Sequence, residues 1–425
     1  MAKVSNYNQR VEVHQIGKNP ELYPILDDLS FKCKNLYNYA NYLIRQEFIN
    51  NGNWIRYNGL NKILCKDQSD YKALLAQTSQ QTLKLLDKNW ASFFKSIKDW
   101  SKHPEKYCGR PKLPKYKAKK TGRSVVVFTN QQCHLKDGFI RFPKIFNGFK
   151  LQTNVPNIQQ VRVVPCGSLY KLEVVYNVVK VEKKPFNYRI CAIDLGLENF
   201  VTLTNNVGLK PTVIKGGVLK SINQYYNKVL SEKQSTLKKI NDKDWSNELE
   251  RFTHKRNNKI EYWIHVYSKK VVEYCIKNEF NTLVVGKNKD WKREINIGHI
   301  NNQKFVGIPY ENFIQKLAYK CEDVGIDFIQ TEESYTSKAS FIDNDELPKE
   351  HIDGLVTNVS GRRIKRGLYK SKDGTLINAD CNGSYNIGRK VFPKEFNFKG
   401  IVGVGLHPVR LNCLAKNFIK SLNAI

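Results

Sequence analysis

The spacing of apolar residues changes along the chain and separates strand-like from helix-like segments. Residues 1–17 alternate between apolar and polar side chains, as in the stretch 11–14, which is typical of an edge strand. From Pro20 onward apolar residues recur at helical spacing, and a second helical pattern with an aromatic stripe begins near Thr78. Such a stripe is typical of a helix-bundle core. We therefore expect a helical domain over residues 18–104.

Short apolar strands follow this helical region. The pattern predicts strands at residues 124–129, 139–142, 149–152, 160–165 and 169–179. Strands of this length and spacing are typical of a small β-barrel. We expect the N-terminal strand to join the barrel, so that residues 1–17 and 105–182 form one domain into which the helical domain is inserted.

The second half of the chain mixes strands with helices. The pattern predicts, in order, hairpinned strands within 189–205, a strand at 211–215, two long basic helices within 218–278, and a strand, a helix and a strand at 281–285, 309–325 and 326–331. This order is that of the ribonuclease-H-like fold. The sequence therefore predicts a separate α/β domain over residues 183–425.

Asp194 is the first candidate metal-binding residue of this domain. It follows an apolar run from Ile190 and precedes a turn at Gly196, so we expect its carboxylate to be desolvated at the base and open at the tip. Such a group needs a partner charge, and Mg²⁺ is the usual one. An aspartate that only caps a turn would have the same local pattern.

A second carboxylate, Asp380, ends another apolar stretch, and Asn382 and Asn386 fall on one helix face after it. The N–H groups at a helix start attract anions, and asparagine side chains orient a carboxylate or contact phosphate. The same pattern also serves as a helix cap. Together with Asp194, it suits phosphodiester hydrolysis, in which carboxylates from different elements bridge two metal ions.

The charge of the chain limits the class of partner. Lys and Arg number 70 against 39 Asp and Glu, which gives a formal net charge of +31. Such an excess favours a polyanionic partner, and 41% hydrophobic residues exclude a disordered basic tail. Aromatic residues, at 12%, are interleaved with the basic ones, which suits base stacking beside phosphate contacts. The sequence contains no apolar run of transmembrane length and no long basic amphipathic helix, so neither feature favours a membrane as the partner.

The ten cysteines are scattered singly, and none of them forms a C-x-x-C pair. A disulfide framework or a zinc knuckle would cluster them, so we expect reduced thiols in a cytoplasmic protein. The N-terminus has no signal-peptide core. If the partner is DNA, the protein of a prokaryotic cell would associate with the nucleoid.

Six segments, in a fixed order, carry a resemblance to a known family: KLPKYKAKK, FTNQ, AIDLGLENFVTLTNN, KNKDWKREINIGHINNQKF, EESYTSKASF and GLYKSKDGTLINADCNGSYNIGRK. In these segments, which extend along nearly the whole chain, the protein resembles the TnpB (OrfB) transposon-encoded RNA-guided nucleases. This family is related to the type V CRISPR effectors. Each segment alone is a weak signal, whereas their joint occurrence in this order is specific.

The resemblance implies an α/β multidomain fold: a RuvC (ribonuclease-H-like) nuclease domain, and a wedge β-barrel domain with an inserted helical recognition domain. It implies an RNA-guided, Mg²⁺-dependent endonuclease that cuts double-stranded DNA beside a short flanking motif, using a guide RNA from the transposon end. No obligate protein partner is implied. Two alternatives remain open, a nuclease-inactive RNA-guided DNA-binding repressor and a CRISPR-associated type V effector of the same fold.

The motif match makes Asp194 the first RuvC aspartate and Asp380 the last, but the family's glutamate is displaced. Most members carry it directly after the strand at 281–285, where this chain has Gly286. Some members place it elsewhere, and EESYTSK offers two glutamates. We favour Glu333 over the preceding Glu332 because it directly precedes SYTSK.

This displacement moves the carboxylate of Glu333 to the next strand, about 4.8 Å further from the strand of Asp194. The local backbone must therefore lean inward for the side chain to reach the site. With that condition met, Asp194, Glu333 and Asp380 would hold two Mg²⁺ ions.

A second departure concerns the family's zinc ribbon. Residues 338–375 contain no cysteine, and a structural zinc site needs thiolate ligands, so no zinc is expected. The segment instead contains SGRRIKRG. We interpret it as a basic lid loop, with Arg363 supporting the active site through contacts with substrate phosphates; a solvated loop is the alternative.

The remaining candidate residues concern nucleic-acid recognition. In relatives, polar residues from the recognition helix and the start of the barrel read the flanking DNA motif. The matching residues here are Gln80, Lys84, Thr129 and Asn130. Contacts with the nucleic-acid backbone are expected from the basic segment 103–123 and from the basic helices, at Tyr116, Lys117, Arg123, Arg256 and Lys259.

Overall fold

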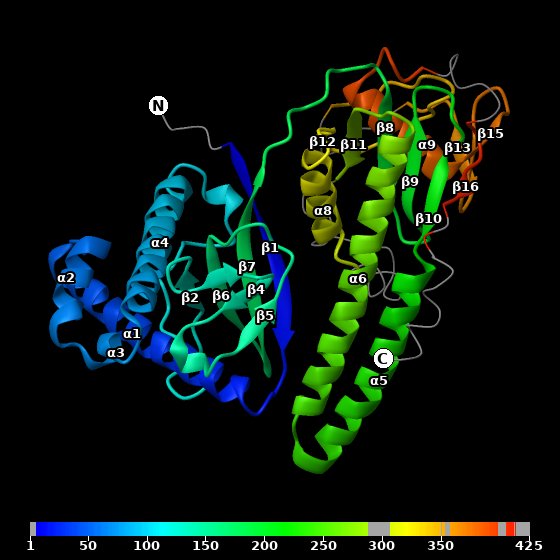
Figure 1. Ribbon diagram of the computed structural model, residues 1–425. Helices are drawn as coiled ribbons and strands as arrows, with labels where there is room; N and C mark the ends of the chain where they lie inside the picture. The colour runs from blue at the N-terminus through cyan, green and yellow to red at the C-terminus, as the bar shows by residue number, and fades with distance from the viewer. Residues whose placement is uncertain are drawn as a thin grey trace. The chain divides into compact units, whose positions relative to one another are not determined.

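The structure is a computed structural model that describes residues 6–287, 307–349, 351–352, 358–397, 405–411 and 413. It divides into two compact units, unit 1 (Met1–Val179) and unit 2 (Lys180–Ile425), both drawn in Figure 1. Nearly all of the segment KNKDWKREINIGHINNQKF lies outside the described residues. No helix in the described ranges is long and apolar enough to cross a membrane.

Unit 1 combines a helical part with short strands. Its helices are α1 (Leu22–Asn51), α2 (Tyr57–Asp67), α3 (Ser69–Lys72), α4 (Ala76–Trp100) and the short turn η1 (Pro104–Lys106). Its strands are β1 (Tyr7–Ile16), β2 (Val126–Thr129), β3 (His134–Lys136), β4 (Phe139–Arg141), β5 (Lys150–Gln152), β6 (Gln160–Cys166) and β7 (Leu169–Val179). The helical spacing from Pro20 and from Thr78 predicted α1 and α4, whereas the pattern missed α2, α3, η1 and the strand β3.

The strands of unit 1 form two antiparallel sheets, one with the order β1-β7-β6-β2 and one with the order β3-β4-β5. The N-terminal strand does join the sheet, because β1 pairs with β7 along its whole length. Within the described residues no ladder joins the edge strands β1 and β2, so the pairing is not that of the closed barrel we expected. The physical reason is that β2 is short and packs against α4, where the Thr129 hydroxyl donates a hydrogen bond to Gln77.

Unit 2 is built on a six-stranded sheet with the order β12-β11-β8-β9-β10-β16. The strands are β8 (Ile190–Leu195), β9 (Asn199–Asn205), β10 (Thr212–Lys215), β11 (Thr282–Gly286), β12 (Asp327–Thr331) and β16 (Val409–Arg410). The helices are α5 (Gly217–Asn241), α6 (Asn247–Lys277), α8 (Tyr310–Glu322) and α9 (Ala379–Val391). Strands β8, β9 and β10 are successively antiparallel, whereas β11 and β12 run parallel to β8.

The alternation along β8 sends neighbouring side chains to opposite faces of this sheet. Cys191 and Ile193 pack into the core formed with α6 and α8, whereas Ala192 packs into the core formed with α9. Figure 1 shows α6 and α9 on opposite faces of the sheet. The same period places Asp194 on the α9 face, at the carboxyl end of its strand.

Candidate active site

Neighbouring strand ends bring two of the candidate carboxylates of unit 2, Asp194 and Glu333, to one edge of the sheet. In the parallel ladder between β8 and β11, Val285 lies opposite Ile193, one position before Gly286 and Asp194. In the ladder between β11 and β12, Gly286 lies opposite Thr331. Glu332 and Glu333 directly follow Thr331 in the sequence. The strand register therefore places positions 194, 286 and 333 beside one another.

The carboxylate of Glu333 reaches back across β11 and lies over Gly286. A Cβ atom built on Gly286 would be 2.9 Å from Oε2 of Glu333 and 2.5 Å from Cδ1 of Ile387 in α9. Both distances are shorter than van der Waals contact allows, so the space of a side chain at position 286 is filled by Glu333 and Ile387. The carboxylate of Glu333 therefore lies within reach of Gly286, in space that a side chain at position 286 would need.

Asp194 lies against helix α9 at a glycine. A Cβ atom on Gly383 would be 2.9 Å from Oδ2 of Asp194, so only glycine lets the helix backbone approach this carboxylate. One residue further along α9, the Ser384 hydroxyl lies 3.1 Å from the carbonyl oxygens of both Ala192 and Thr202. These contacts fix α9 to β8 and β9 and hold the carboxylate in place.

The environment of Asp194 disfavours its charge. Protein atoms surround the carboxylate, although the residue as a whole keeps some exposed surface. This desolvation, together with the negative charges of Glu333 and Asp380, raises the pKa of Asp194 well above its usual range. Burial also raises the pKa of Glu333, to about 7. A cation at this edge of the sheet would stabilise both carboxylates in their charged form.

Asp380 stands in the first turn of α9 and is oriented by two asparagines. The side chain of Asn378 caps the helix by accepting hydrogen bonds from the backbone N–H groups of Asp380 and Cys381, each at 3.1 Å. The side chain of Asn199 donates a 2.6 Å hydrogen bond to Oδ2 of Asp380, and Lys215 donates in turn to Asn199. The sequence pattern gives no signal for Asn199 and Lys215, because only the pairing of β9 with β10 places them next to α9.

A pocket of about 700 Å³ opens beside Asp380. Its lining includes the turn after Asp194, at Gly196 and Glu198, and three basic residues, Lys215, Arg363 and Arg366. An acidic group at the wall of a pocket with basic side chains can hold a cation while the bases contact phosphate.

The donor set of this site fits Mg²⁺, although the groups are not drawn together. Three carboxylates are ligands that Mg²⁺ prefers, and Oε2 of Glu333 is buried with no hydrogen-bond partner in the described part of the chain. Within the same residues, no group of three or more His, Cys, Asp or Glu side chains is close enough to hold a metal ion.

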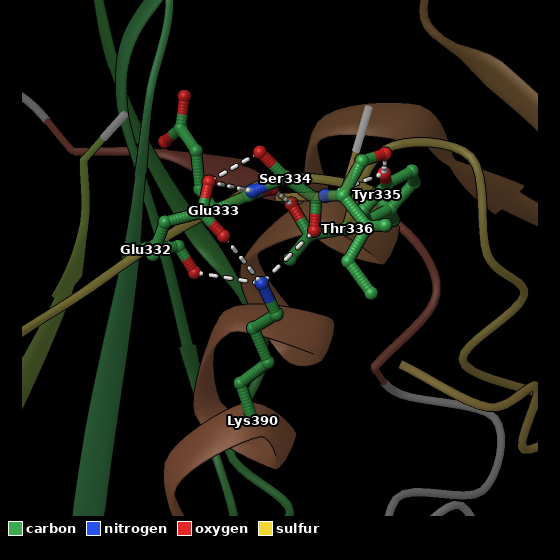
Figure 2. A network of polar contacts seen from close by, with 7 residues as sticks. Glu332, Glu333, Ser334, Tyr335, Thr336 and Lys390 are labelled. Carbon is green, nitrogen blue, oxygen red and sulfur yellow. Dashed lines mark hydrogen bonds and ion pairs between the residues drawn. The ribbon is translucent and has the colours of Figure 1, made fainter. Parts of the chain in front are cut away.

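Figure 2 shows that the adjacent residues Glu332 and Glu333 make different contacts. The ammonium group of Lys390 donates to the backbone oxygen and to Oε2 of Glu332, both at 2.9 Å, and to the backbone oxygen of Ser334 at 3.0 Å. Glu332 also accepts hydrogen bonds from the N–H and the hydroxyl of Ser334. No dashed line reaches the carboxylate of Glu333 in Figure 2. Glu332 is therefore held in an ion pair, whereas Glu333 is free to bind a ligand.

Lys390 is a residue that our sequence analysis overlooked. Its side chain is only 2% exposed, and its three acceptors lie on both sides of Glu333 in the sequence. It therefore fixes the backbone on which Glu333 stands. The signal was its spacing: Asn382, Asn386 and Lys390 recur every four residues on one face of α9.

The two asparagines of this face make contacts different from those we expected. Both side chains are fully buried, so neither is open to phosphate. Asn382 donates to the backbone oxygen of Ala339 and accepts from the N–H of Phe341, and Asn386 donates to the backbone oxygens of Thr336 and Ala339. They support the site indirectly, by anchoring the segment after Glu333 to α9.

The basic segment SGRRIKRG is a strand in the structure, where we expected a loop. Residues Arg362–Lys365 form β13, which pairs with β14 (Leu368–Lys370), and β14 pairs with β15 (Leu376–Asn378). Arg363 points toward the site, with Nη2 3.9 Å from Oδ1 of Asp380. Residues 350 and 353–357 of the expected lid lie outside the described residues.

The four residues that we assigned to DNA-motif reading lie on α4 and at the end of β2, which meet in unit 1. The contacts join Thr129 to Gln77 and Gln132 to Thr78, at the start of α4. Gln80 and Lys84 follow on the same helix, Asn130 follows Thr129, and the ammonium of Lys84 lies 5.1 Å from the ring centre of Tyr57. Gln77 and Gln132 are polar residues of this junction that our sequence analysis did not select.

Two of the residues assigned to backbone contacts use their charge within the fold. Arg123 forms a bidentate pair with Asp27 at 2.8 and 2.7 Å, which lowers the pKa of that aspartate. In unit 2, Arg256 donates to Asn223 and to the backbone oxygen of Gly307. Both arginines therefore stabilise local structure, and their guanidinium groups are engaged there.

The other three residues keep more of their surface. Tyr116 is 44% exposed, and the ammonium of Lys117 lies 5.3 Å from the ring centre of Tyr37. Lys259 is exposed on α6 in unit 2. Partial burial of Lys117 lowers the pKa of its ammonium group.

Comparison with known proteins agrees with this reading of the sequence. Residues 173–292 match the family model OrfB_IS605, described as a probable transposase, and residues 310–387 match the Cas12f1-like TNB domain. No curated protein matches the chain.

Solved structures show weak similarity over most of the chain. A Cas12f1–sgRNA–target DNA complex has 16% sequence identity and a TM-score of 0.35, over 89% of this chain and 98% of that one. A CRISPR-Cas12f ternary complex has 14% identity and a TM-score of 0.35, over 87% and 82%. The C2c1 protein of Alicyclobacillus acidoterrestris with single-guide RNA has 7% identity and a TM-score of 0.33, over 88% and 67%.

The assignment to a family rests on the two family models. They match successive segments of the chain, and between them they contain Asp194, Glu333 and Asp380. On this evidence the chain is a TnpB-like protein, related to the type V effectors.

Proposed function

We propose that this protein is an RNA-guided, Mg²⁺-dependent DNA endonuclease whose reaction centre is formed by Asp194, Glu333 and Asp380. The observation that carries the proposal is the position of Glu333. Its Oε2 atom is buried without a hydrogen-bond partner in the described chain, and it lies over Gly286 at the strand end beside Asp194. A protein that left this carboxylate without a ligand would lose stability for no structural gain.

The three carboxylates would hold Mg²⁺, which when bound supplies an activated water and stabilises the leaving 3′ oxygen. The chain's own residues perform the other tasks. Asn199 orients Asp380 through its hydrogen bond, and Lys390 fixes the backbone that carries Glu333. The close approach of α9 at Gly383 excludes bulk water from one side of Asp194.

Substrate binding would use the basic wall of the pocket beside Asp380. Lys215, Arg363 and Arg366 line it, and they can contact the phosphates on either side of the scissile bond. Glu198 on the same wall lies 3.7 Å from Arg366, so one acidic residue already offsets part of this charge.

The domain assignment belongs to the same proposal. A sheet of three antiparallel strands followed by two parallel ones suits a RuvC nuclease domain over residues 183–425. Residues 1–17 and 105–182 would be the wedge domain and residues 18–104 the recognition domain. The net charge of +31 supports nucleic-acid partners, which we take to be a guide RNA from the transposon end and target double-stranded DNA.

The test uses the full-length protein with the RNA that co-purifies with it. Sequencing this RNA identifies the guide segment, and a plasmid that carries the matching target beside a randomised flank reports cleavage with Mg²⁺. We expect Asp194→Asn and Glu333→Gln to abolish cleavage while guide-RNA binding stays nearly intact. The control is Asp323→Asn, which removes an exposed carboxylate at the end of α8, away from the site. If the wild-type complex binds the target without nicking it, the endonuclease proposal is wrong.

That negative result would favour the second candidate, an RNA-guided DNA-binding repressor. The observation in its favour is Gly286, because most members of the resembled family carry the catalytic glutamate at this strand end. The origin of the co-purified RNA separates a transposon-encoded nuclease from a CRISPR-associated effector, because a repeat-derived sequence would identify the latter.

A further inference from the structure

Unit 1 contains a pocket of about 520 Å³ that the proposed cleavage reaction does not use. It lies between the second halves of α1 and α4 and the segment that follows η1. Its apolar lining is formed by Phe48, Phe93, Phe94, Ile97 and Leu113. Apolar surface of this kind is unfavourable in water, so the pocket needs an explanation.

The aromatic floor of the pocket is rigid. The rings of Phe48 and Phe94 meet edge to face at 5.4 Å between their centres, and the rings of Phe93 and Phe94 lie 5.2 Å apart. The fully buried Trp90 packs behind them and donates a 2.9 Å hydrogen bond to Asn41. Aromatic packing of this density holds the floor in one arrangement before any ligand binds.

The rim of the pocket is positively charged. Four of its lining residues, Arg45, Arg110, Lys112 and Lys115, are basic, and none of the lining residues is acidic. The guanidinium of Arg45 lies over the ring of Tyr116 at 4.8 Å. Its Nε atom is buried and has no hydrogen-bond partner among the described residues, so a donor at the pocket lacks an acceptor.

The segment that carries the basic rim is fixed along helix α1. Asn41 donates to the backbone oxygen of Pro114, Asn38 makes hydrogen bonds with both the N–H and the oxygen of Lys117, and Lys34 donates to the backbone oxygen of Lys119. These three side chains recur on one face of the helix. The extended backbone is satisfied by the helix, and the rim is therefore preformed.

The features of the pocket define its occupant. The floor suits a flat apolar body, and the four cations suit negative charges close to it. A nucleotide meets both requirements, since its base has apolar faces and its phosphates flank it. An alkyl chain would fill the floor but bring no negative charge to the rim.

We propose that this pocket receives an unstacked base of the guide RNA, with the neighbouring phosphates bound by the basic rim. The inference rests on the proposed function and names a contact of its RNA partner. RNA is the source because a folded guide offers unpaired bases in loops and bulges, whereas duplex DNA exposes none until it is opened.

The test compares two probes and two variants of the full-length protein. The probes are a short oligouridylate and the same strand with abasic positions, and binding is measured at fixed salt by fluorescence anisotropy. Ile97→Trp fills the pocket from α4 with an indole. Ser92→Trp is the control, because it adds the same ring on an exposed position of that helix outside the pocket.

We expect Ile97→Trp to weaken oligouridylate binding about tenfold or more, as the loss of one stacked base does, and to leave binding of the abasic strand unchanged. Ser92→Trp should change neither. In the complex as purified, ultraviolet crosslinking followed by mass spectrometry should join an RNA base to a peptide that contains Phe93 and Phe94.

Three results would overturn the assignment. The pocket does not bind a base if Ile97→Trp affects both probes equally or neither. It does not bind RNA in particular if oligothymidylate binds as tightly as oligouridylate and loses as much affinity in Ile97→Trp. Failure of the proposed function is distinguishable, because it appears as a wild-type complex that lacks guide RNA or does not cut, whatever the pocket variant does.

Discussion

The substitution Glu333→Gln tests the electrostatic state of the site without relying on cleavage. In the metal-free protein the carboxylate of Glu333 is desolvated and lies near the negative charge of Glu332, and both effects raise its pKa. Replacing it with an isosteric neutral amide removes the charge and keeps the volume. We therefore expect the variant to be more stable than the wild type when no metal is present.

The pKa of Glu333 sets the magnitude and the pH window. The pKa rises from an ordinary value of 4.5 in the unfolded chain to about 7 in the fold. At about 1.36 kcal/mol for each pKa unit, this difference corresponds to at most about 3.4 kcal/mol. The folded state holds the proton more tightly, so the penalty is absent below pH 4.5, grows as the pH rises, and is complete above about pH 7.

The assay is chemical denaturation followed by a signal from unit 2, at pH 5 and at pH 8.5, in chelator and in Mg²⁺. In chelator, Glu333→Gln should stabilise the protein by about 1–3 kcal/mol at pH 8.5 and by much less at pH 5. Mg²⁺ should stabilise the wild type in proportion to its occupancy, and the variant should lose most of this gain.

The neighbouring Glu332→Gln is a matched control with the opposite sign. It removes the charge that pairs with the buried ammonium of Lys390 at 2.9 Å, and should destabilise the protein by about 1–3 kcal/mol. The reasoning about Glu333 is refuted if its variant is no more stable than wild type in chelator at pH 8.5, or if the difference between them does not depend on pH.

Three further substitutions test how the site is held. Gly286→Ala should reduce cleavage at least tenfold and destabilise the protein by about 1–3 kcal/mol, because its Cβ would lie 2.5 Å from Ile387 and 2.9 Å from Glu333. Adding Ile387→Ala should recover part of the stability. A fully active Gly286→Ala would contradict the close approach. Lys390→Met should raise the Mg²⁺ concentration needed for half-maximal cleavage and increase amide hydrogen exchange just after β12, whereas unchanged exchange would show that Lys390 does not position Glu333. Asn199→Ala should lower the cleavage rate about tenfold with guide-RNA binding unchanged, because Asp380 loses its 2.6 Å hydrogen bond; equal losses in RNA binding and cleavage would point to a folding defect.

Local patterns determined much of the architecture. The apolar run before Asp194 predicted a buried strand that leads into a carboxylate, and β8 (Ile190–Leu195) is buried along this run and ends one residue after Asp194. Helical spacing predicted α5, α6 and α8 to within a few residues. The helices α6 and α8 each bury one apolar face in the core that they form with the sheet. These predictions succeed since the alternation of side chains is set by neighbours in the sequence.

The barrel and the lid could not be predicted in the same way. Whether a sheet closes depends on what covers its edge strands, and β2 packs against α4, where Gln77 lies 52 residues before its partner Thr129. Likewise SGRRIKRG reads as a loop from its composition, but pairing with β14 makes it a strand. Glycine and charge describe the segment, and only the partner strand decides its conformation.

Some features of the site were determined by the sequence alone, and others only by the tertiary structure. The sequence by itself identified Asp194 and Asp380 as carboxylates at element ends, and it located Glu333 only through the family resemblance. Tertiary structure alone decided that Glu333 fills the space left by Gly286 and that Lys390 holds the backbone around it. The physical reason is that a carboxylate's charge, orientation and partners are set by atoms within a few ångströms, and here those atoms come from strands and a helix far apart in the chain.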